Sequence, residues 1–363
     1  MTTKLIIWSH SPLLNTGLGR GAHYLGRGLS QKGYDVYILS QFYSGKPTKI
    51  EDYTILPTPS GSTGIELIPY YWNKYGFDLM ITWLNWHSLG PVQAPNVIYY
   101  TPIESQVIPP MFREWSYNKI IVPVSQFTRD LLGKDYYIPL GVDTKIYRPV
   151  PESKNTDLFV VGFVGMNERR KMLDRLVKAF TIFAKDKDDV LLSLHTTITP
   201  IDRTQWGWDL NYLLRRFELK GKVRITGHVP YAFNEYDMSM LYNSFTVYAS
   251  ASSAEGWGLP VLEAQACGVP CICPDNTSHT ELVKEHGELV PCNDSMIAGF
   301  GEELLLVDVN EFAERLNKLY YNRELVDKYG RASREFAMKY DWGRVIDKWD
   351  KLINRLCLKI PMR

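Results

Sequence analysis

Long apolar runs are absent from this chain of 363 residues. The longest charge-free apolar run, residues 158–166, is far shorter than the ~20 residues that a membrane-spanning helix needs. Residues 1–8 hold one lysine and a short apolar run, whereas the hydrophobic region of a signal peptide needs about 7–15 residues. We therefore expect a soluble, cytoplasmic protein.

An excess of charge of either sign is also absent, since 41 Lys and Arg residues stand against 40 Asp and Glu residues. Up to residue 150 there are 13 basic and 10 acidic residues, and after it there are 28 and 30. A protein that binds nucleic acid through its phosphates needs a basic surplus on at least one face. Neither half is a polycation, so we expect no nucleic acid among the partners.

Cysteine is scarce, and an odd set of five excludes a disulfide framework as the organising principle. Cys267, Cys271 and Cys273 could be read as metal ligands, but their apolar surroundings favour a buried strand in which free cysteine behaves as a small hydrophobe. The one Asp-x-Asp motif, Asp186 to Asp188, lies in a charged turn and indicates solvated surface. We therefore expect no metal site.

Short apolar runs alternate with amphipathic stretches in the first part of the chain. The runs that predict strands are 4–8, 36–39, 79–83, 97–100, 120–124 and 136–138. Between the first two, Ala22, Leu25 and Leu29 recur at helical spacing before Gly33, which ends the helix. Continuous apolar runs are typical of a sheet buried on both faces. We predict a doubly wound parallel-sheet domain over residues 1–150.

The pattern starts again after a polar, proline-bearing segment, 147–155, which predicts a linker. The second set of predicted strands is 158–164, 190–194, 223–226, 245–248, 269–273 and 288–290. We predict a second Rossmann-like domain over 151–340. The helical tract after Asp308 ends in a predicted helix over 341–363, which is a candidate to cross back to the first domain. Two such α/β domains face each other across a cleft at the carboxyl ends of their strands, where ligands bind.

The most informative segment is 255–268, directly after a predicted strand. A helix is expected to begin near Pro260, because proline is well tolerated at a first helical position. Gly268 supplies the left-handed residue that ends such a helix. The segment therefore predicts a strand, a loop and a helix at the carboxyl end of the second sheet.

Two glycines and two glutamates give this loop its chemistry. Gly256 and Gly258 allow a close backbone approach to a ligand just before the helix, whose N-terminal amides favour an anion. Glu255 in the loop and Glu263 one turn into the helix can face the same cleft. Two carboxylates beside an anion-binding backbone suit the hydroxyl groups and the phosphate of a sugar nucleotide.

The segment resembles the Glu-x7-Glu signature of retaining glycosyltransferases of family 4, which belong to the group 1 glycosyl transferases and have the GT-B fold. Other segments resemble further family motifs in the family's order, from Gly17 to about Trp342: Pro-x-Gly-Val-Asp at 139–143, Gly-x5-Lys at 165–171, and Cys-Gly-Val-Pro at 267–270 with Glu281. Two glutamates at this spacing are common on solvated helices, so the Glu-x7-Glu pattern alone is a weak signal. The other motifs, which occur in the same order as in the family, make the resemblance specific.

The resemblance implies a role for each of these positions. It implies that Glu255 holds the donor sugar and that Glu263 binds the ribose hydroxyls, which suits a carboxylate that accepts from two vicinal hydroxyl groups. The loop that would cradle the diphosphate consists of Gly256, Trp257, Gly258 and Leu259.

Cations at the diphosphate are implied at Arg170 and Lys171 of the basic loop. Fixed positive charge there stabilises the negative charge that develops on the leaving diphosphate, so that neither Mg²⁺ nor another cofactor is required. Many family members carry an arginine directly after the glycine of this loop, where this chain has Met166. Arg170 is therefore our choice for the arginine, with Arg169 as its competitor.

A glycine-rich stretch near the start, Gly17-Leu-Gly19-Arg-Gly-Ala22, allows a rival reading as a dinucleotide-binding fingerprint. That fingerprint follows its strand at once, whereas residues 9–16 intervene here, and no carboxylate follows the second predicted strand to bind a ribose. The stretch resembles the first-domain glycine loop of the family, which implies that Gly17 and Gly19 approach the donor diphosphate.

A histidine that family members often place after the fourth strand is missing from residues 97–104, where Thr101 or Pro102 stands at that place. His87 and His10 follow other predicted strands, and for each a structural role or a contact with the acceptor is at least as good a reading as a catalytic role. The aromatic residues of the first half are mainly core, with acceptor stacking as the minority reading.

The resemblance implies a retaining, metal-independent glycosyltransferase that moves a hexosyl unit from a UDP- or GDP-linked sugar to a hydroxyl acceptor. The acceptor is a glycan, a lipid-linked molecule or a small molecule, and peripheral association with the inner face of a membrane stays open. The alternatives are a non-catalytic nucleotide-sugar-binding protein and a sugar-nucleotide epimerase on the same fold.

Overall fold

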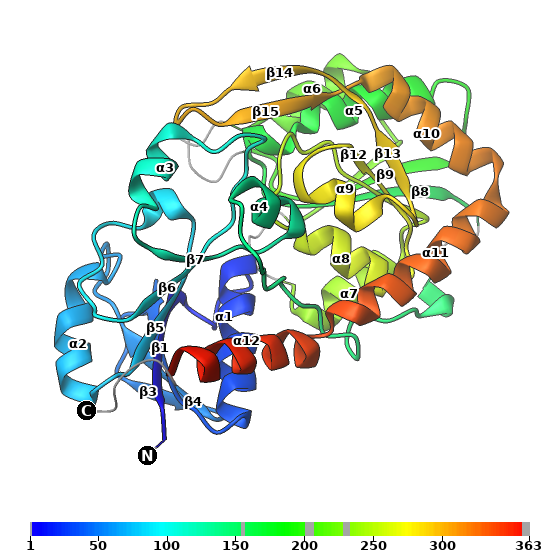
Figure 1. The fold of residues 1–363 in the computed structure, drawn as a ribbon. Helices are drawn as coiled ribbons and strands as arrows, with labels where there is room; N and C mark the ends of the chain where they lie inside the picture. The colour runs from blue at the N-terminus through cyan, green and yellow to red at the C-terminus, as the bar shows by residue number, and fades with distance from the viewer. Residues whose placement is uncertain (1, 154–156, 200–206, 228–232, 358–363) are drawn as a thin grey trace. The chain divides into compact units, whose positions relative to one another are not determined.

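The computed structural model describes residues 2–153, 157–199, 207–227 and 233–357. The chain forms two compact units (Figure 1). The first comprises Met1–Ile103, Pro110–Gly141 and Tyr340–Arg363, and the second comprises Glu104–Pro109 and Val142–Lys339. No helix in the described residues is long and apolar enough to cross a membrane.

The first unit is built on a seven-stranded sheet in the order β3-β4-β2-β1-β5-β6-β7. All neighbouring pairs are parallel except β3 and β4. The strands are β1 (Lys4–His10), β2 (Asp35–Gln41), β3 (Thr48–Ile50), β4 (Tyr53–Pro57), β5 (Leu79–Trp83), β6 (Val97–Tyr100) and β7 (Ile120–Val122). The central strands are buried on both faces, which explains their continuous apolar sequence.

Helices of the first unit include one from the far end of the chain. The helices are α1 (Gly17–Gln31), α2 (Ile68–Tyr75), α3 (Pro110–Trp115), α4 (Gln126–Leu131) and α12 (Trp342–Cys357), with short 3-10 turns at Ile65–Leu67 and Trp86–Ser88. The Trp342 indole stacks on Tyr24 of α1 at 5.1 Å. A Cβ at Gly28 would lie 2.4 Å from Ile346, so the small residue allows α12 to pack closely on α1.

The second unit contains a six-stranded, all-parallel sheet in the order β10-β9-β8-β11-β12-β13. The strands are β8 (Phe159–Val164), β9 (Val190–His195), β10 (Val223–Thr226), β11 (Val247–Ala249), β12 (Cys271–Pro274) and β13 (Glu288–Val290). The helices are α5 (Leu173–Phe183), α6 (Leu210–Arg216), α7 (Glu235–Asn243), α8 (Leu259–Ala266), α9 (Thr277–Val283), α10 (Val309–Tyr321) and α11 (Arg323–Ala337), with 3-10 turns at Pro151–Ser153 and Arg169–Lys171. A further 3-10 turn, Met338–Tyr340, lies where the chain leaves the second unit.

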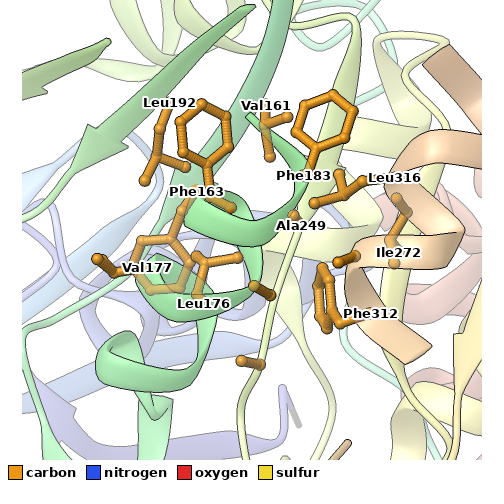
Figure 2. Packing of buried hydrophobic residues seen from close by; sticks show 14 of the residues in the cluster. Val161, Phe163, Leu176, Val177, Phe183, Leu192, Ala249, Ile272, Phe312 and Leu316 are labelled. Atoms are coloured by element: carbon orange, nitrogen blue, oxygen red, sulfur yellow. The ribbon is translucent and has the colours of Figure 1, made fainter. Parts of the chain in front are cut away.

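The core of the second unit lies where the sheet meets α5 and α10 (Figure 2). Strand residues such as Val161, Phe163 and Leu192 are fully buried. Leu176 of α5 and Phe312 of α10 belong to the same cluster and are also fully buried. This packing fixes the carboxyl ends of β8 and β11, where the candidate site lies.

One predicted strand was wrong, and four strands of the structure were not predicted. The predicted strand at 136–138 is irregular, with Tyr136 38% exposed, and β3 and β4 were not predicted. An antiparallel hairpin of β14 (Cys292–Ile297) and β15 (Glu303–Val307) interrupts the otherwise parallel second unit and was also missed. Leu305 N donates to the carbonyl of Ser253, so this hairpin lies against the loop that follows β11.

The segment predicted as a linker is anchored to the second unit where it is described. The Asn243 amide accepts a hydrogen bond from Val150 N and donates one to the Arg148 carbonyl, and Arg334 donates to the Tyr147 carbonyl. The remaining residues of this segment include 154–156, which lie outside the described residues.

Candidate functional site

The basic loop follows β8 and is held by a buried asparagine. Asn167 is 4% exposed, and its side-chain NH₂ donates to the carbonyls of Thr197 (3.0 Å) and Trp208 (2.7 Å). Its amide oxygen accepts from Trp208 N at 2.8 Å. The loop ends in a 3-10 turn over Arg169–Lys171 that leads into α5. The Asn167 side chain and the 3-10 turn thus hold the backbone of Arg170 and Lys171 in place.

A second loop, between β11 and α8, is held by the residues at the start of α9. Asn276 donates to the carbonyls of Ser252 and Ser253, and Thr277 accepts from the backbone N–H of Glu255 at 3.0 Å. The Ser278 hydroxyl is within hydrogen-bond distance of the carbonyls of Glu255 (2.9 Å) and Trp257 (2.6 Å). These hydrogen bonds hold Glu255 in place.

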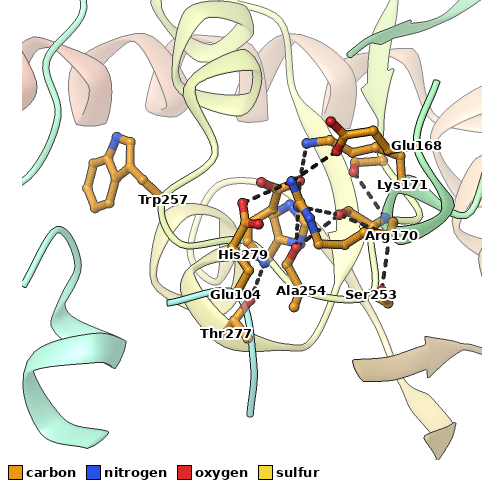
Figure 3. Close-up of polar contacts among 12 residues, drawn as sticks. Glu104, Glu168, Arg170, Lys171, Ser253, Ala254, Trp257, Thr277 and His279 are labelled. Atoms are coloured by element: carbon orange, nitrogen blue, oxygen red, sulfur yellow. Dashed lines mark hydrogen bonds and ion pairs between the residues drawn. The ribbon is translucent and has the colours of Figure 1, made fainter. Parts of the chain in front are cut away.

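These two loops bring opposite charges together (Figure 3). The Lys171 ammonium lies 2.5 Å from Glu255 Oε1, and Arg170 Nη1 lies 3.0 Å from the same oxygen. Arg170 Nη1 also donates to the Ala254 carbonyl at 2.6 Å. Three predicted residues, Arg170, Lys171 and Glu255, therefore meet at one place in the second unit.

Burial and charge set the protonation of this cluster. Burial raises the pKa of Glu255, but Arg170 and Lys171 outweigh it, and the net pKa lies well below the ordinary value. Burial lowers the pKa of Arg170, yet its carboxylate neighbours bring the net pKa above the ordinary value. Both groups are therefore charged at neutral pH.

His279 of α9 is fully buried next to this cluster and was not predicted. Burial lowers its pKa to about 4, and the positive charges of Lys171 and Arg170 act in the same direction against Glu255. Its Nδ1 lies 3.2 Å from the Asn276 side-chain oxygen. The imidazole is therefore neutral at pH 7.

Glu104 is a further residue that sequence reasoning did not assign. It follows β6 at the stretch where the family histidine is missing, and its Oε1 lies 2.9 Å from Arg170 Nη2. Glu168 approaches the same nitrogen at 3.6 Å. No local pattern could have revealed the pair, because 66 positions separate Glu104 from Arg170.

The second glutamate of the signature lies inside α8. Glu263 is 4% exposed, and Tyr242 O–H donates to its Oε2 at 2.7 Å. The helix begins at Leu259 after Gly258, whose φ of 104° is left-handed, and Pro260 lies in its first turn, as predicted. Trp257 is 2% exposed and lies to one side of the ion pairs in Figure 3.

The other predicted residues lie elsewhere. Gly17 and Gly19 are in the first turn of α1 in the first unit, where a Cβ on Gly19 would lie 2.4 Å from the Leu14 carbonyl oxygen. Arg169 lies in the 3-10 turn of the basic loop, directly before Arg170, and is exposed. His10 contacts Thr16 through Nδ1 at 3.4 Å, and His87 is exposed.

The cysteines in question are core residues. Cys267, Cys271 and Cys273 are buried, and burial raises the pKa of each thiol. Within the described residues, no three or more His, Cys, Asp or Glu side chains gather in a way that could hold a metal ion.

Comparison with known proteins gives concordant findings. Residues 148–336 match the family model described as glycosyl transferases group 1. O-antigen chain mannosyltransferase B of Escherichia coli is 30% identical over 197 residues, which make up 48% of this chain and 48% of that protein. The chain thus spans about half the length of this relative.

Solved structures show the same fold. Sucrose-phosphate synthase from Thermosynechococcus elongatus has a TM-score of 0.80 at 18% identity, over 99% of this chain and 100% of that chain. Anabaena HepE in complex with UDP-glucose has a TM-score of 0.70 at 13% identity, over 97% and 99%. The predicted GT-B architecture of two Rossmann-like parallel-sheet domains is confirmed.

Proposed function

The chain belongs to the group 1 glycosyl transferase family, and from this premise we propose that it is a retaining, metal-independent enzyme that moves a hexosyl unit from a nucleoside diphosphate sugar to a hydroxyl acceptor. Glycosyltransferase activity itself follows from the family. The observation that carries the proposal is the convergence of Arg170 and Lys171 on the buried carboxylate of Glu255.

The donor is a UDP- or GDP-linked sugar under this proposal. Support comes from HepE, which has the same fold and was solved with UDP-glucose, and from the mannosyl transfer named for the Escherichia coli relative. The bound UDP-glucose and the mannosyl transfer are properties of those two proteins. The base and the sugar used by this chain are therefore determined by the experiment below.

The chemistry that this site would perform is stabilisation of a leaving diphosphate. Negative charge develops on the diphosphate oxygens as the glycosidic bond breaks, and preorganised cations aimed at those oxygens lower the barrier. We assign this role to Lys171 and Arg170, with the backbone of residues 256–259 as the cradle. Glu255 holds the donor sugar and Glu263 the ribose hydroxyls. The acceptor oxygen attacks from the side of the leaving group, and the diphosphate takes up its proton.

The test begins with a thermal-shift screen of UDP-, GDP- and ADP-sugars, since a ligand at 100 times its Kd adds about 2.7 kcal/mol of stability. The donor that stabilises the protein is then incubated with candidate acceptors, and NMR follows the anomeric configuration. The proposal expects transfer with retained configuration that survives dialysis against EDTA. Inverted product, or loss of turnover on removal of metal that Mg²⁺ restores, contradicts it.

A further inference from the structure

Carboxylates outnumber cations around the Arg170 guanidinium. Arg170 and Lys171 carry two positive charges, whereas Glu104, Glu168 and Glu255 carry three negative charges within 4 Å of one or other cation. A diphosphate adds further negative charge to this place. A carboxylate and a diphosphate that share a cation repel each other strongly where water is partly excluded. A carboxylate that stays beside Arg170 therefore opposes the binding of the diphosphate.

Glu104 is the carboxylate whose position fits this role. Arg170 turns its Nη1 toward Glu255 and the Ala254 carbonyl, and its Nη2 toward Glu104 at 2.9 Å. Nη2 is thus the edge of the guanidinium that a phosphate oxygen and the Glu104 carboxylate would both bind. The Glu104 side chain is 28% exposed, so a ligand can reach it, whereas Glu255 is at 9%.

The backbone that carries Glu104 is held to the second unit next to this place. Gln106 N donates to the Glu303 carbonyl at 2.9 Å, and Glu303 N donates to the Ser105 hydroxyl at 3.0 Å. These hydrogen bonds attach residues 104–109 to the start of β15. The carboxylate is therefore held against Arg170 by its own backbone as well as by the ion pair.

We propose that Glu104 is a competing anion of the donor site, which shares the Nη2 edge of Arg170 with the diphosphate and weakens its binding. This inference rests on the proposed function. The effect is larger on the product than on the donor, because the free nucleoside diphosphate carries more negative charge than its sugar ester. Glu104 is thus a positioning residue that acts through Arg170 and promotes release of the nucleoside diphosphate.

The test measures Kd by isothermal titration calorimetry with UDP and GDP as probes, and with UDP-glucose and GDP-mannose as the matching esters. Glu104→Gln keeps an oxygen that accepts from Nη2 and removes the charge, whereas Glu104→Ala removes both. Both variants should bind the nucleoside diphosphate about tenfold more tightly than the wild type, and the ester with a smaller gain. The matched control is Glu288→Gln, which removes the charge from a buried glutamate elsewhere in the second unit, paired with Lys318 at 2.6 Å. Its Kd should equal that of the wild type.

The pH dependence separates charge from mere packing. Burial raises the pKa of Glu104, and Arg170 and Lys171 oppose this while Glu255 and Glu168 reinforce it. Protonated Glu104 no longer competes, so the ratio of wild-type Kd to Glu104→Gln Kd should be largest at alkaline pH and should fall toward one as the pH is lowered and Glu104 takes up its proton. The titration of the phosphate is common to both proteins and cancels in this ratio.

The outcomes distinguish the inference from the proposed function. Wild-type binding that neither variant strengthens, or that Glu104→Ala weakens, overturns the inference and leaves the donor site standing. A Kd ratio that does not change with pH also overturns it. Binding of neither UDP nor GDP by the wild type and both variants overturns the proposed donor and this inference together.

Discussion

Each unit has a glycine-bearing turn that leads into a helix, and the two turns are stabilised by different means. In the first unit the Thr16 hydroxyl accepts from Gly19 N at 2.9 Å, and no acidic side chain lies in the first turn of α1. In the second unit the turn before α8 carries Glu255, whose carboxylate contacts two cations. The Ser278 hydroxyl lies within hydrogen-bond distance of two carbonyls of this turn, those of Glu255 and Trp257.

Both turns lead into a helix, so this arrangement of the backbone does not determine how the turn is stabilised. A neutral, capped turn satisfies its backbone at little cost, whereas the charged turn buries a carboxylate that must be paired to be tolerated. A buried ion pair is weak evidence for a role in stability, so the proposed role in binding the diphosphate explains the charged turn better. The following predictions test this contrast.

The largest effect is expected for Lys171→Ala. Loss of one preorganised cation at a developing charge costs about 10²–10³ in rate, so kcat should fall by this factor with the fold intact by circular dichroism. Lys318→Ala is the matched control, because Lys318 also pairs with a buried glutamate, Glu288, at 2.6 Å. Lys318→Ala should keep its kcat, and equal kcat values for the two variants would refute the assignment.

The second prediction concerns pH and His279. Its pKa is lowered to about 4 in the folded chain, while the unfolded chain protonates near its ordinary value of 6.5. The unfolded state therefore binds the proton first, and the wild type should lose stability as the pH falls from 6.5 to about 4, by up to about 1.4 kcal/mol per pH unit.

Urea unfolding at a series of pH values measures this loss. His279→Gln should have a flatter profile over the same window, whereas His87→Gln, at an exposed position of the first unit, should follow the wild type. Below about pH 4, the lowered pKa of Glu255 adds a further loss in all three proteins. An unchanged slope in His279→Gln would count against the burial of a neutral imidazole.

The third prediction concerns packing of the neutral turn. A Cβ on Gly19 would lie 2.4 Å from the Leu14 carbonyl oxygen and 2.6 Å from that of Ser11, so Gly19→Ala should lose about 1–3 kcal/mol in the free energy of unfolding. Gly299→Ala, where a Cβ would meet nothing within 4 Å, should change it by less than about 0.5 kcal/mol. Equal losses would contradict this account of the turn.

The smallest effects are expected for the two hydroxyl groups. Ser278→Ala leaves the carbonyls of Glu255 and Trp257 without this donor in a buried place, which costs about 1–2 kcal/mol. Thr16→Ala removes the cap of a helix end that is partly exposed, at about 1 kcal/mol. Chemical denaturation compares them, and a larger loss for Thr16→Ala would reverse the expected contrast.

Sequence reasoning succeeded where the pattern is local. The helix that begins by Pro260 and the left-handed Gly268 follow from backbone rules that act over a few residues. The central strands were found because they are continuous apolar runs. The predicted strand at 136–138 shows the limit, since its aromatic sequence favours a strand but Tyr136 lies exposed and irregular.

The missed residues depend on contacts between distant parts of the chain. Glu104 meets Arg170, and β15 reaches Ser253, only once the second unit has folded. Asn276 was within reach, because an Asn-Thr-Ser run after a predicted strand is a typical helix start. Its bonds to the loop after β11 could not be read from that pattern.

The most direct test of the central claim, that the charged turn of the second unit holds a nucleoside diphosphate, is the Kd of UDP and GDP for the wild type and Lys171→Ala by isothermal titration calorimetry. The account predicts that the wild type binds at least one of them and that the variant binds it at least about tenfold more weakly. Equal affinity in the two proteins would contradict it.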